Sequence, residues 1–364
     1  MVLFLSSELH KIYYEKKSIF YWLIFTFVVS SCGTRSISFQ ALEPGQITLP
    51  ADVKTIAVIN RYKPDRTKDK VLNFIEGLLT GEMVGTDLVG SRSAVEGLQQ
   101  KLSESPRVKV IFIPYELKGS GTGFFPDPLP PSEVKKICEQ YSADALVSLE
   151  AFDHDVSKRI KRIETKKTEN GREVINVQFM ATKWIRINAG WRVYDATGTK
   201  LIDEHQMLTE MGFNNTAPTE AAAFAGIPNA MQLVPRVGNQ AGFDYATRIA
   251  PHYVWITRSF YSKTKNQNIR EGANKARFGY WSEAAEKWIK ATEDPDPKTA
   301  AKACYNMSIA AEAMGNFDVA ESWAKKAYEK HPKSRYNDRI WEIKDRIQKS
   351  QRLDMQMAPV ENNP

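Results

Sequence analysis

The chain has 364 residues, of which 42% are hydrophobic and 26% are charged. These values are ordinary for folded globular proteins and argue against a disordered or fibrous chain. Fifty basic residues against 43 acidic ones give a net charge of +7, a small excess for this length. A nucleic-acid interface concentrates its basic residues on one large patch, so we expect no nucleic-acid partner. The length favours two folded domains.

The first 31 residues have the character of a removable export signal. Three lysines precede an apolar run at residues 19–29. These 11 residues are fewer than the roughly 20 that a helix needs to cross a bilayer. The segment ends in Val-Ser-Ser-Cys-Gly, with the cysteine at position 32. This resembles a lipobox, in which small residues precede a cysteine that receives lipid.

Lipidation of Cys32 predicts an envelope protein whose first partner is membrane lipid. Several buried acyl methylenes at about 0.8 kcal/mol each would hold a water-soluble body at a bilayer. The following residue is Gly33 and not the aspartate that retains many lipoproteins at the inner membrane, so we expect the outer membrane. Residues 32–50 are predicted to be a lipidated tether. A short membrane anchor with a chance cysteine is the alternative.

A first domain is predicted at residues 51–262, and its first half alternates strands with helices. The expected elements are a strand at 55–60, a helix at 70–79, a helix opening at 91, a strand at 107–113, a helix at 131–141 and a strand at 143–150. This alternation predicts a partly parallel sheet with flanking helices.

The second half of this domain is rich in β-forming residues. Long segments at 174–194 and 201–209 follow the turn sequences Asn170-Gly171 and Asp195–Gly198. They predict an antiparallel meander. A last helix is expected at 243–261, with Pro251 inside it. The predicted class of this domain is therefore α+β, with a mixed sheet.

Two sets of motifs resemble known envelope proteins. The early strand, the Ala-Asp-Ala-Leu-Val stretch at 143–147 and the turn at Asp195–Gly198 resemble the α/β domain of the curli secretion channel lipoprotein and of penicillin-binding-protein activators. The stretches 245–251 and 258–261 resemble a Bacteroidetes lipoprotein family of unknown function that joins such a domain to helical repeats. These resemblances imply an envelope location and no established activity.

A second, all-α domain is predicted at residues 265–350 from a pattern that occurs twice. The first copy has Gly279, Trp281, Ala284, Trp288 and Ala291, and the second has Gly315, Phe317, Ala320, Ala324, Ala327 and Pro332. The pattern resembles the 34-residue tetratricopeptide repeat, in which small residues let paired helices approach closely. We expect a helix to open at 306, a capping helix at 335–351 and a disordered tail at 351–364. A generic helical bundle is the alternative.

No residue pattern predicts catalysis, a cofactor or a metal ion. The glycines at 119–123 lack the lysine of a nucleotide loop. Asp153, His154 and Asp155 alternate across a strand and so do not converge on one ion. Cys138 and Cys304 are expected to be buried apolar residues, with a disulfide between them as the alternative. We therefore predict that the chain is not an enzyme.

Two sets of side chains are candidates for binding. The basic run Lys158, Arg159, Lys161 and Arg162 is expected either to be a solvated strand edge or to contact anionic lipid or carbohydrate. The aromatic residues of the repeats are expected to be mostly core. The candidates from this group for a partner-binding groove are Tyr280, Trp288 and Tyr305.

The predicted function is a membrane-anchored, non-enzymatic scaffold or adaptor. Helical repeats commonly bind peptides or helices of other proteins, so an envelope protein partner is expected at the second domain. One alternative is a homo-oligomeric assembly or secretion accessory subunit built on the α/β domain. A second alternative is an enzyme that acts on cell-wall or glycan material.

Overall fold

The computed structural model describes residues 33–63, 85–169 and 172–358. The predicted export signal, Cys32 and the predicted helix at 70–79 lie outside these ranges. The described residues form two compact units. The α/β unit holds Leu42–Val254 and the residues from Ser350 onward, and the helical unit holds the residues up to Ala41 together with Trp255–Lys349.

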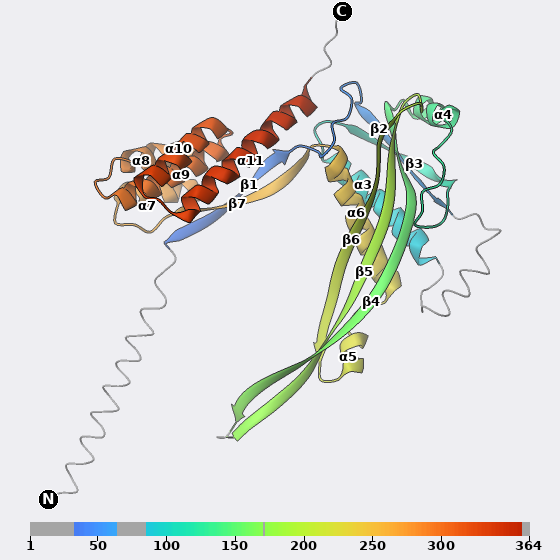
Figure 1. The fold of residues 1–364 in the computed structure, drawn as a ribbon, viewed down its shortest axis with the longest axis horizontal. Helices are drawn as coiled ribbons and strands as arrows, with labels where there is room; N and C mark the ends of the chain where they lie inside the picture. Colours follow the sequence, from blue (N-terminus) through green and yellow to red (C-terminus); the bar gives the residue numbers. More distant parts are fainter. Residues whose placement is uncertain (1–32, 64–84, 170–171, 359–364) are drawn as a thin grey trace, which may run out of the picture. The chain divides into compact units, whose positions relative to one another are not determined.

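The α/β unit is built on a five-stranded sheet with the order β3-β2-β4-β5-β6 (Figure 1). Its strands are β2 (Thr55–Lys63), β3 (Lys109–Lys118), β4 (Ala145–Glu169), β5 (Arg172–Asp195) and β6 (Leu201–Ala217). β2 pairs in parallel with both β3 and β4, whereas β4 with β5 and β5 with β6 are antiparallel. The predicted mixed sheet with an antiparallel meander is therefore confirmed.

Helices cover both faces of the parallel part of this sheet. The helices of the unit are α3 (Thr86–Ser103), α4 (Pro131–Tyr141), α5 (Glu220–Ala225) and α6 (Ala230–Ile249). α3 and α6 share a core with Ile56 and Val58, while α4 packs with Ala57 and Ile59. Successive side chains of a strand point to opposite faces, so burial of both faces explains why β2 is apolar without alternation.

α3 and α6 touch through their backbones. A Cβ at Gly242 of α6 would lie 1.9 Å from the carbonyl oxygen of Ala94, and one at Gly97 of α3 would lie 2.1 Å from that of Asn239. No side chain fits at those distances. The pair therefore depends on glycine at the crossing.

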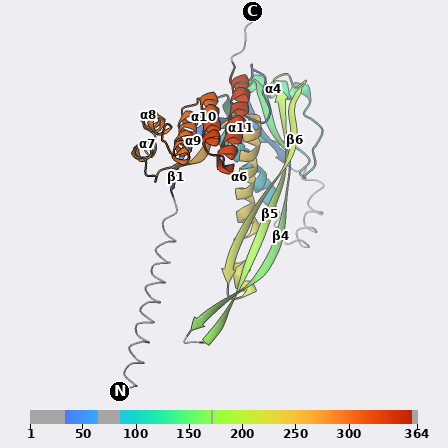
Figure 2. The ribbon, with the colours of Figure 1, turned by 60° about the vertical axis from the view of Figure 1, so that its left-hand side comes forward.

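The helical unit opens with a two-stranded sheet of β1 (Thr34–Glu43) and β7 (His252–Tyr261). Its helices are α7 (Gln267–Ala276), α8 (Trp281–Ala291), α9 (Pro297–Ala313), α10 (Phe317–Lys330) and α11 (Ser334–Met357), the last counted here as far as Lys349. Figure 2 shows α7 beside α8 and α9 beside α10. Among the described helices, none is both long and apolar enough to cross a bilayer.

The helices form two pairs of equal design, which confirms the predicted helical repeat. Gly279 and Gly315 end the two turns with φ angles of 78° and 79°. Ala284 and Ala291 of α8 are fully buried, as are Ala320 and Ala327, which lie 36 residues later in α10. Small residues at equal offsets thus seat the second helix of each pair.

The predicted tether at 32–50 was wrong where the structure describes it. Residues 34–43 form β1, and its Ser36 and Ser38 side chains hydrogen-bond to Ser259 and Thr257 of β7 at 2.7 Å and 2.8 Å. Serine and threonine suit an exposed ladder of this kind as well as they suit a linker. Composition alone therefore did not distinguish the two.

The predicted helix at 243–261 was correct only as far as Ile249 and wrong beyond it. α6 ends at Ile249, Ala250 is extended with φ −142° and ψ 151°, and β7 follows. A residue before proline is disfavoured in the helical region, so Pro251 ends the helix and does not kink it. The apolar residues Ile256 and Phe260 are therefore buried side chains of strand β7 and not of a helix.

Three predicted helix boundaries differ from the structure. α3 begins at Thr86, five residues before the predicted opening, and has the acidic residue Asp87 in its first turn, where a negative charge is favourable. α9 begins at Pro297 and not at Asn306, since Asp296 caps it through the amides of Lys298 and Thr299. α11 continues to Met357, so residues 351–357 of the predicted tail are helical.

Candidate functional site

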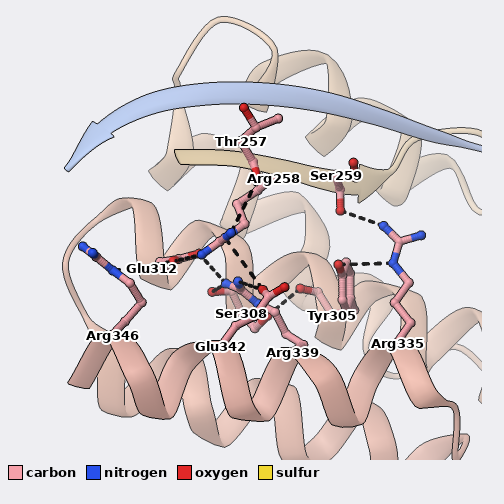
Figure 3. A network of polar contacts seen from close by, with 10 residues as sticks. All are labelled: Thr257, Arg258, Ser259, Tyr305, Ser308, Glu312, Arg335, Arg339, Glu342 and Arg346. Atoms are coloured by element: carbon pink, nitrogen blue, oxygen red, sulfur yellow. Dashed lines mark hydrogen bonds and ion pairs between the residues drawn. The ribbon is translucent and has the colours of Figure 1, made fainter. Parts of the chain in front are cut away.

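A buried carboxylate, Glu312 near the end of α9, joins a network of polar contacts in the helical unit (Figure 3). Both guanidinium nitrogens Nε and Nη2 of Arg258 donate to it at 2.8 Å. Arg339 of α11 donates to the Oε2 atom at 2.6 Å. Glu312 and Arg339 are only 3% and 1% exposed, so these ion pairs are shielded from water.

Further polar contacts extend this network along α11. Arg339 also donates to the hydroxyl and the carbonyl of Ser308 at 3.0 Å and 3.2 Å. Arg335 donates to the Tyr305 hydroxyl at 3.2 Å and to the Ser259 carbonyl at 3.0 Å. Strand β7 and helices α9 and α11 are thereby joined by directional contacts (Figure 3).

The charges around Glu312 decide its protonation. Burial by itself would raise the pKa of this carboxyl, but the hydrogen bonds from Arg258 and the charges of Arg339 and Arg258 outweigh burial and lower it. The group is therefore a carboxylate at neutral pH. Its side chain is only 1% exposed and offers almost no surface to a substrate, so its role is to position the elements of the helical unit.

The sequence contained only a weak signal for this network. Glu312 stands in the alanine-rich stretch Ile309–Ala313, on a face that is otherwise apolar. A charged residue there needs a buried partner. The partners Arg258 and Arg339 are 54 and 27 positions away, and no local pattern identifies them.

Two of the three predicted partner-binding aromatics belong to the core. Trp288 is 0% exposed and its Nε1 donates to the carbonyl of Ile269 at 3.1 Å, while Tyr305 is 7% exposed. Neither can contact a partner in this structure, which corrects the prediction for both. Large aromatic residues contribute most to a small core, which explains their burial. Tyr280 is 55% exposed and remains accessible.

Tyr280 belongs to an exposed apolar surface at the turns of the two helix pairs. Phe278 beside it is 67% exposed, and their ring centroids are 6.4 Å apart. Met314 of the next turn is 40% exposed, and its sulfur accepts from the Ser282 hydroxyl at 3.6 Å. Phe278, Tyr280 and Met314 are hereafter called the turn patch.

The predicted basic run lies on β4, and all four of its side chains are exposed. Lys158 and Arg162 point to one face of the sheet, whereas Arg159 and Lys161 point to the other. Lys158 stands directly opposite Lys183 of β5. Like charges at that spacing are unfavourable, and the Lys183 ammonium donates instead to the carbonyls of Ile227 and Pro228 at 3.0 Å and 3.1 Å. Contact of the basic run with an anionic surface stays a prediction.

A second buried carboxylate, Glu150 of β4, holds a loop of the α/β unit. It pairs with Arg61 at 2.6 Å and accepts from the Tyr194 hydroxyl at 2.8 Å. Arg61 and Arg192 donate in turn to carbonyls of the loop, those of Asp127 and Pro126, each at 2.7 Å. Glu150 is 0% exposed, so it anchors the loop and cannot reach a substrate.

The cysteines and histidines of the described ranges form no reactive cluster. Cys138 and Cys304 are both buried and free, so the disulfide alternative is wrong. The His154 ring contacts Asp87 at 2.5 Å. Within residues 33–63, 85–169 and 172–358, no group of three His, Cys, Asp or Glu side chains is arranged to hold a metal ion.

Two family models match the chain. One, described as a domain of unknown function (DUF8603), matches residues 53–261. Another, described as a domain of unknown function (DUF6340), matches residues 270–354. No curated protein matches the chain in sequence. Because the first match covers more than half of its residues, the chain belongs to the DUF8603 family.

Proposed function

We propose that the chain is a lipid-anchored envelope scaffold that binds a protein partner through its helical unit. The observation that carries this proposal is the turn patch, where Phe278, Tyr280 and Met314 are 67%, 55% and 40% exposed. Exposed aromatic and methionine side chains are typical of protein-binding surfaces. The tetratricopeptide resemblance of the two helix pairs supports a peptide or a helix as the bound element.

The anchor in this proposal is Cys32, which lies outside the described residues. Its support is the sequence Val-Ser-Ser-Cys-Gly after a short apolar run. Palmitate labelling of cells that express the chain tests it. Cys32→Ser is expected to abolish the label and to move the protein out of the membrane fraction, and an unchanged fraction would refute the anchor.

The partner is tested by crosslinking in cells, with a photoreactive residue at position 280 and analysis by mass spectrometry. We expect a discrete crosslinked protein that is lost when Phe278 is changed to Ser in the same chain. The matched control is Val319→Ser on α10, since Val319 is 50% exposed on the same unit. Equal loss in both variants, or no crosslink with intact folding, contradicts the turn patch as the binding surface.

An oligomeric assembly subunit is the second candidate function. The observation that supports it is β6, the last strand in the order of the sheet, on which Leu208 is 64% exposed. An edge strand can pair with another chain. Light scattering in detergent measures the oligomeric state of the wild-type chain and of Leu208→Lys. A wild-type monomer whose mass does not change in the variant excludes association through β6.

A further inference from the structure

We propose that one face of the extended β4–β5 hairpin binds the surface of a bilayer that contains anionic phospholipid. The hairpin arm is defined as residues 158–168 of β4 and 173–183 of β5. Pairing of β5 with β6 ends at Phe179 and Ala217, while pairing of β4 with β5 continues to Glu169 and Arg172. β4 and β5 therefore run past β6 as a two-stranded ribbon (Figure 1).

The arm carries a strong and uneven charge. It has seven basic and two acidic residues, a net charge of +5. Both acidic residues, Glu164 and Glu173, lie on the face that continues the helix-covered core, because they share it with Ala181. There they pair with Arg162 at 3.0 Å and Lys166 at 2.8 Å. The negative charge of the arm is thus confined to one face.

Within these limits the opposite face, called the open face, has three cations and no anion, and the ladder ends one pair beyond them with Glu169 opposite Arg172. The members of the open face are Arg159, Lys161, Ile163, Thr165 and Lys167 from β4 and Val174, Asn176, Gln178, Met180 and Thr182 from β5. Arg159, Lys161 and Lys167 are all exposed. Among the described residues, none of these three cations has an ion pair or hydrogen bond. They are available for an external anion.

Apolar side chains stand between these cations. Val174 lies opposite Lys167 and is 43% exposed, and Met180 lies opposite Lys161. At the base of the same face, the Trp184 ring lies over Gly212, where a Cβ would come within 2.9 Å of the ring. Cations that flank apolar and indole groups match the boundary between headgroups and acyl chains.

A soluble polyanion fits this face less well than a bilayer does. Val174, Ile163 and Met180 have no function against a hydrated polyanion, whereas they gain by entering a headgroup layer. Protection of an unpaired strand edge by lysine accounts for charge on β4 in general. It does not account for both glutamates lying on the other face.

The test uses the full lipidated chain in vesicles of phosphatidylcholine, with or without phosphatidylglycerol. An environment-sensitive fluorophore is placed at Thr165→Cys, on the open face. We expect a blue-shifted, brighter emission only with phosphatidylglycerol, weakened by salt. The variant R159E/K161E/K167E is expected to reduce the response at least about tenfold. The control K54E/K109E/K136E has the same change of net charge at other exposed sites of the α/β unit and should retain it.

Equal emission in both kinds of vesicle, or an unchanged response of the triple reversal, overturns the proposal. A salt-sensitive response to soluble heparin without one to phosphatidylglycerol assigns the arm to a soluble polyanion and also overturns it. Val174→Ser should reduce the blue shift but keep the salt-sensitive association. The inference rests on the proposed lipid anchor only in that the anchor would bring the hairpin arm close to a bilayer. Mass spectrometry reports acylation separately, and co-sedimentation measures the lipid response of a chain without acyl groups.

Discussion

Glu312 of α9 accepts two hydrogen bonds of 2.8 Å from the guanidinium of Arg258 on β7, one at each carboxylate oxygen, and its Oε2 accepts a third from Arg339 of α11. Glu312→Gln removes the charge that balances the buried guanidinium of Arg339 and the partly buried one of Arg258. Breaking such a pair from one side typically costs about 3–5 kcal/mol. We expect that loss in the free energy of local opening, measured by hydrogen exchange of the α9 amides.

The matched control for this substitution is Glu342→Gln. Glu342 also pairs with Arg339, at 3.0 Å, but its side chain is 47% exposed. An exposed pair contributes up to about 1 kcal/mol, so the control should change α9 protection little. Equal effects of the two substitutions would refute the central role of Glu312.

The same network predicts a sensitivity to acid. The pKa of Glu312 is lower in the folded chain than its ordinary value of 4.5, because the arginine contacts outweigh burial. Its stabilisation is therefore complete above pH 4.5 and is lost as the pH falls through the lowered folded pKa. The stability difference between the wild-type chain and Glu312→Gln should narrow over that acidic window in urea titrations. A constant difference would show that Glu312 is not the titrating group.

The positive φ angles of the turn glycines predict that alanine and asparagine substitutions there differ in their cost to folding stability. Gly315 has a φ of 79° and a Cβ there would meet nothing within 4 Å, so backbone strain is the only cost of a side chain. Gly315→Ala should destabilise the helical unit by about 1–2 kcal/mol. Gly315→Asn should cost less, because asparagine tolerates this conformation. Thermal unfolding followed by circular dichroism compares them, and equal melting temperatures would contradict the explanation.

Backbone contact between α3 and α6 predicts that a single methyl group is not tolerated. Gly242→Ala would place a Cβ 1.9 Å from the Ala94 carbonyl oxygen, so the helices must separate. Overpacking typically costs about 1–3 kcal/mol, and a backbone obstacle should give the upper end of that range. Gly33→Ala, whose new Cβ would come no closer than 3.5 Å to another residue, is the control without a clash. Urea unfolding measures both, and a Gly242→Ala cost no larger than that of the control would refute the close contact.

The two internal cysteines are expected to be inert in the folded chain. Burial raises the pKa of both Cys138 and Cys304 to about 11, so little thiolate forms near neutral pH. Maleimide at pH 8 should leave both thiols unmodified in the native protein and label both in urea, as counted by mass spectrometry. Labelling of either thiol within minutes without urea would show that its site is open.

Elements with a strong local pattern were predicted from the sequence. The helix at 131–141 was found with its residue limits, since its apolar spacing and Pro131 are both local signals. The repeat of the helical unit was visible because identical packing needs the same small residues at a constant offset of 36 positions. The meander followed from turn residues between long β-rich segments.

Other features depended on segments that are distant along the chain. The local sequence of β1 does not distinguish a strand from a linker, because its hydrogen-bonding partner is β7, more than 200 residues later. Trp288 and Tyr305 are residue types that are common in binding surfaces. Only the packing of the helices shows that both side chains face the core. The asymmetry of the hairpin arm became visible only with the register of β4 against β5.

The sequence by itself determined the mixed sheet of β2 to β6, the repeated helix pairs and the signature around Cys32, because each is encoded by neighbouring residues. The tertiary structure decided that Arg258, Glu312 and Arg339 meet, and that the unpaired cations of the arm share one face. Such pairings join positions whose separation carries no periodic signal. The ion pairs exist because the folded chain brings their elements together and excludes water from between them, whereas the shared face of the exposed cations follows from the register of β4 against β5.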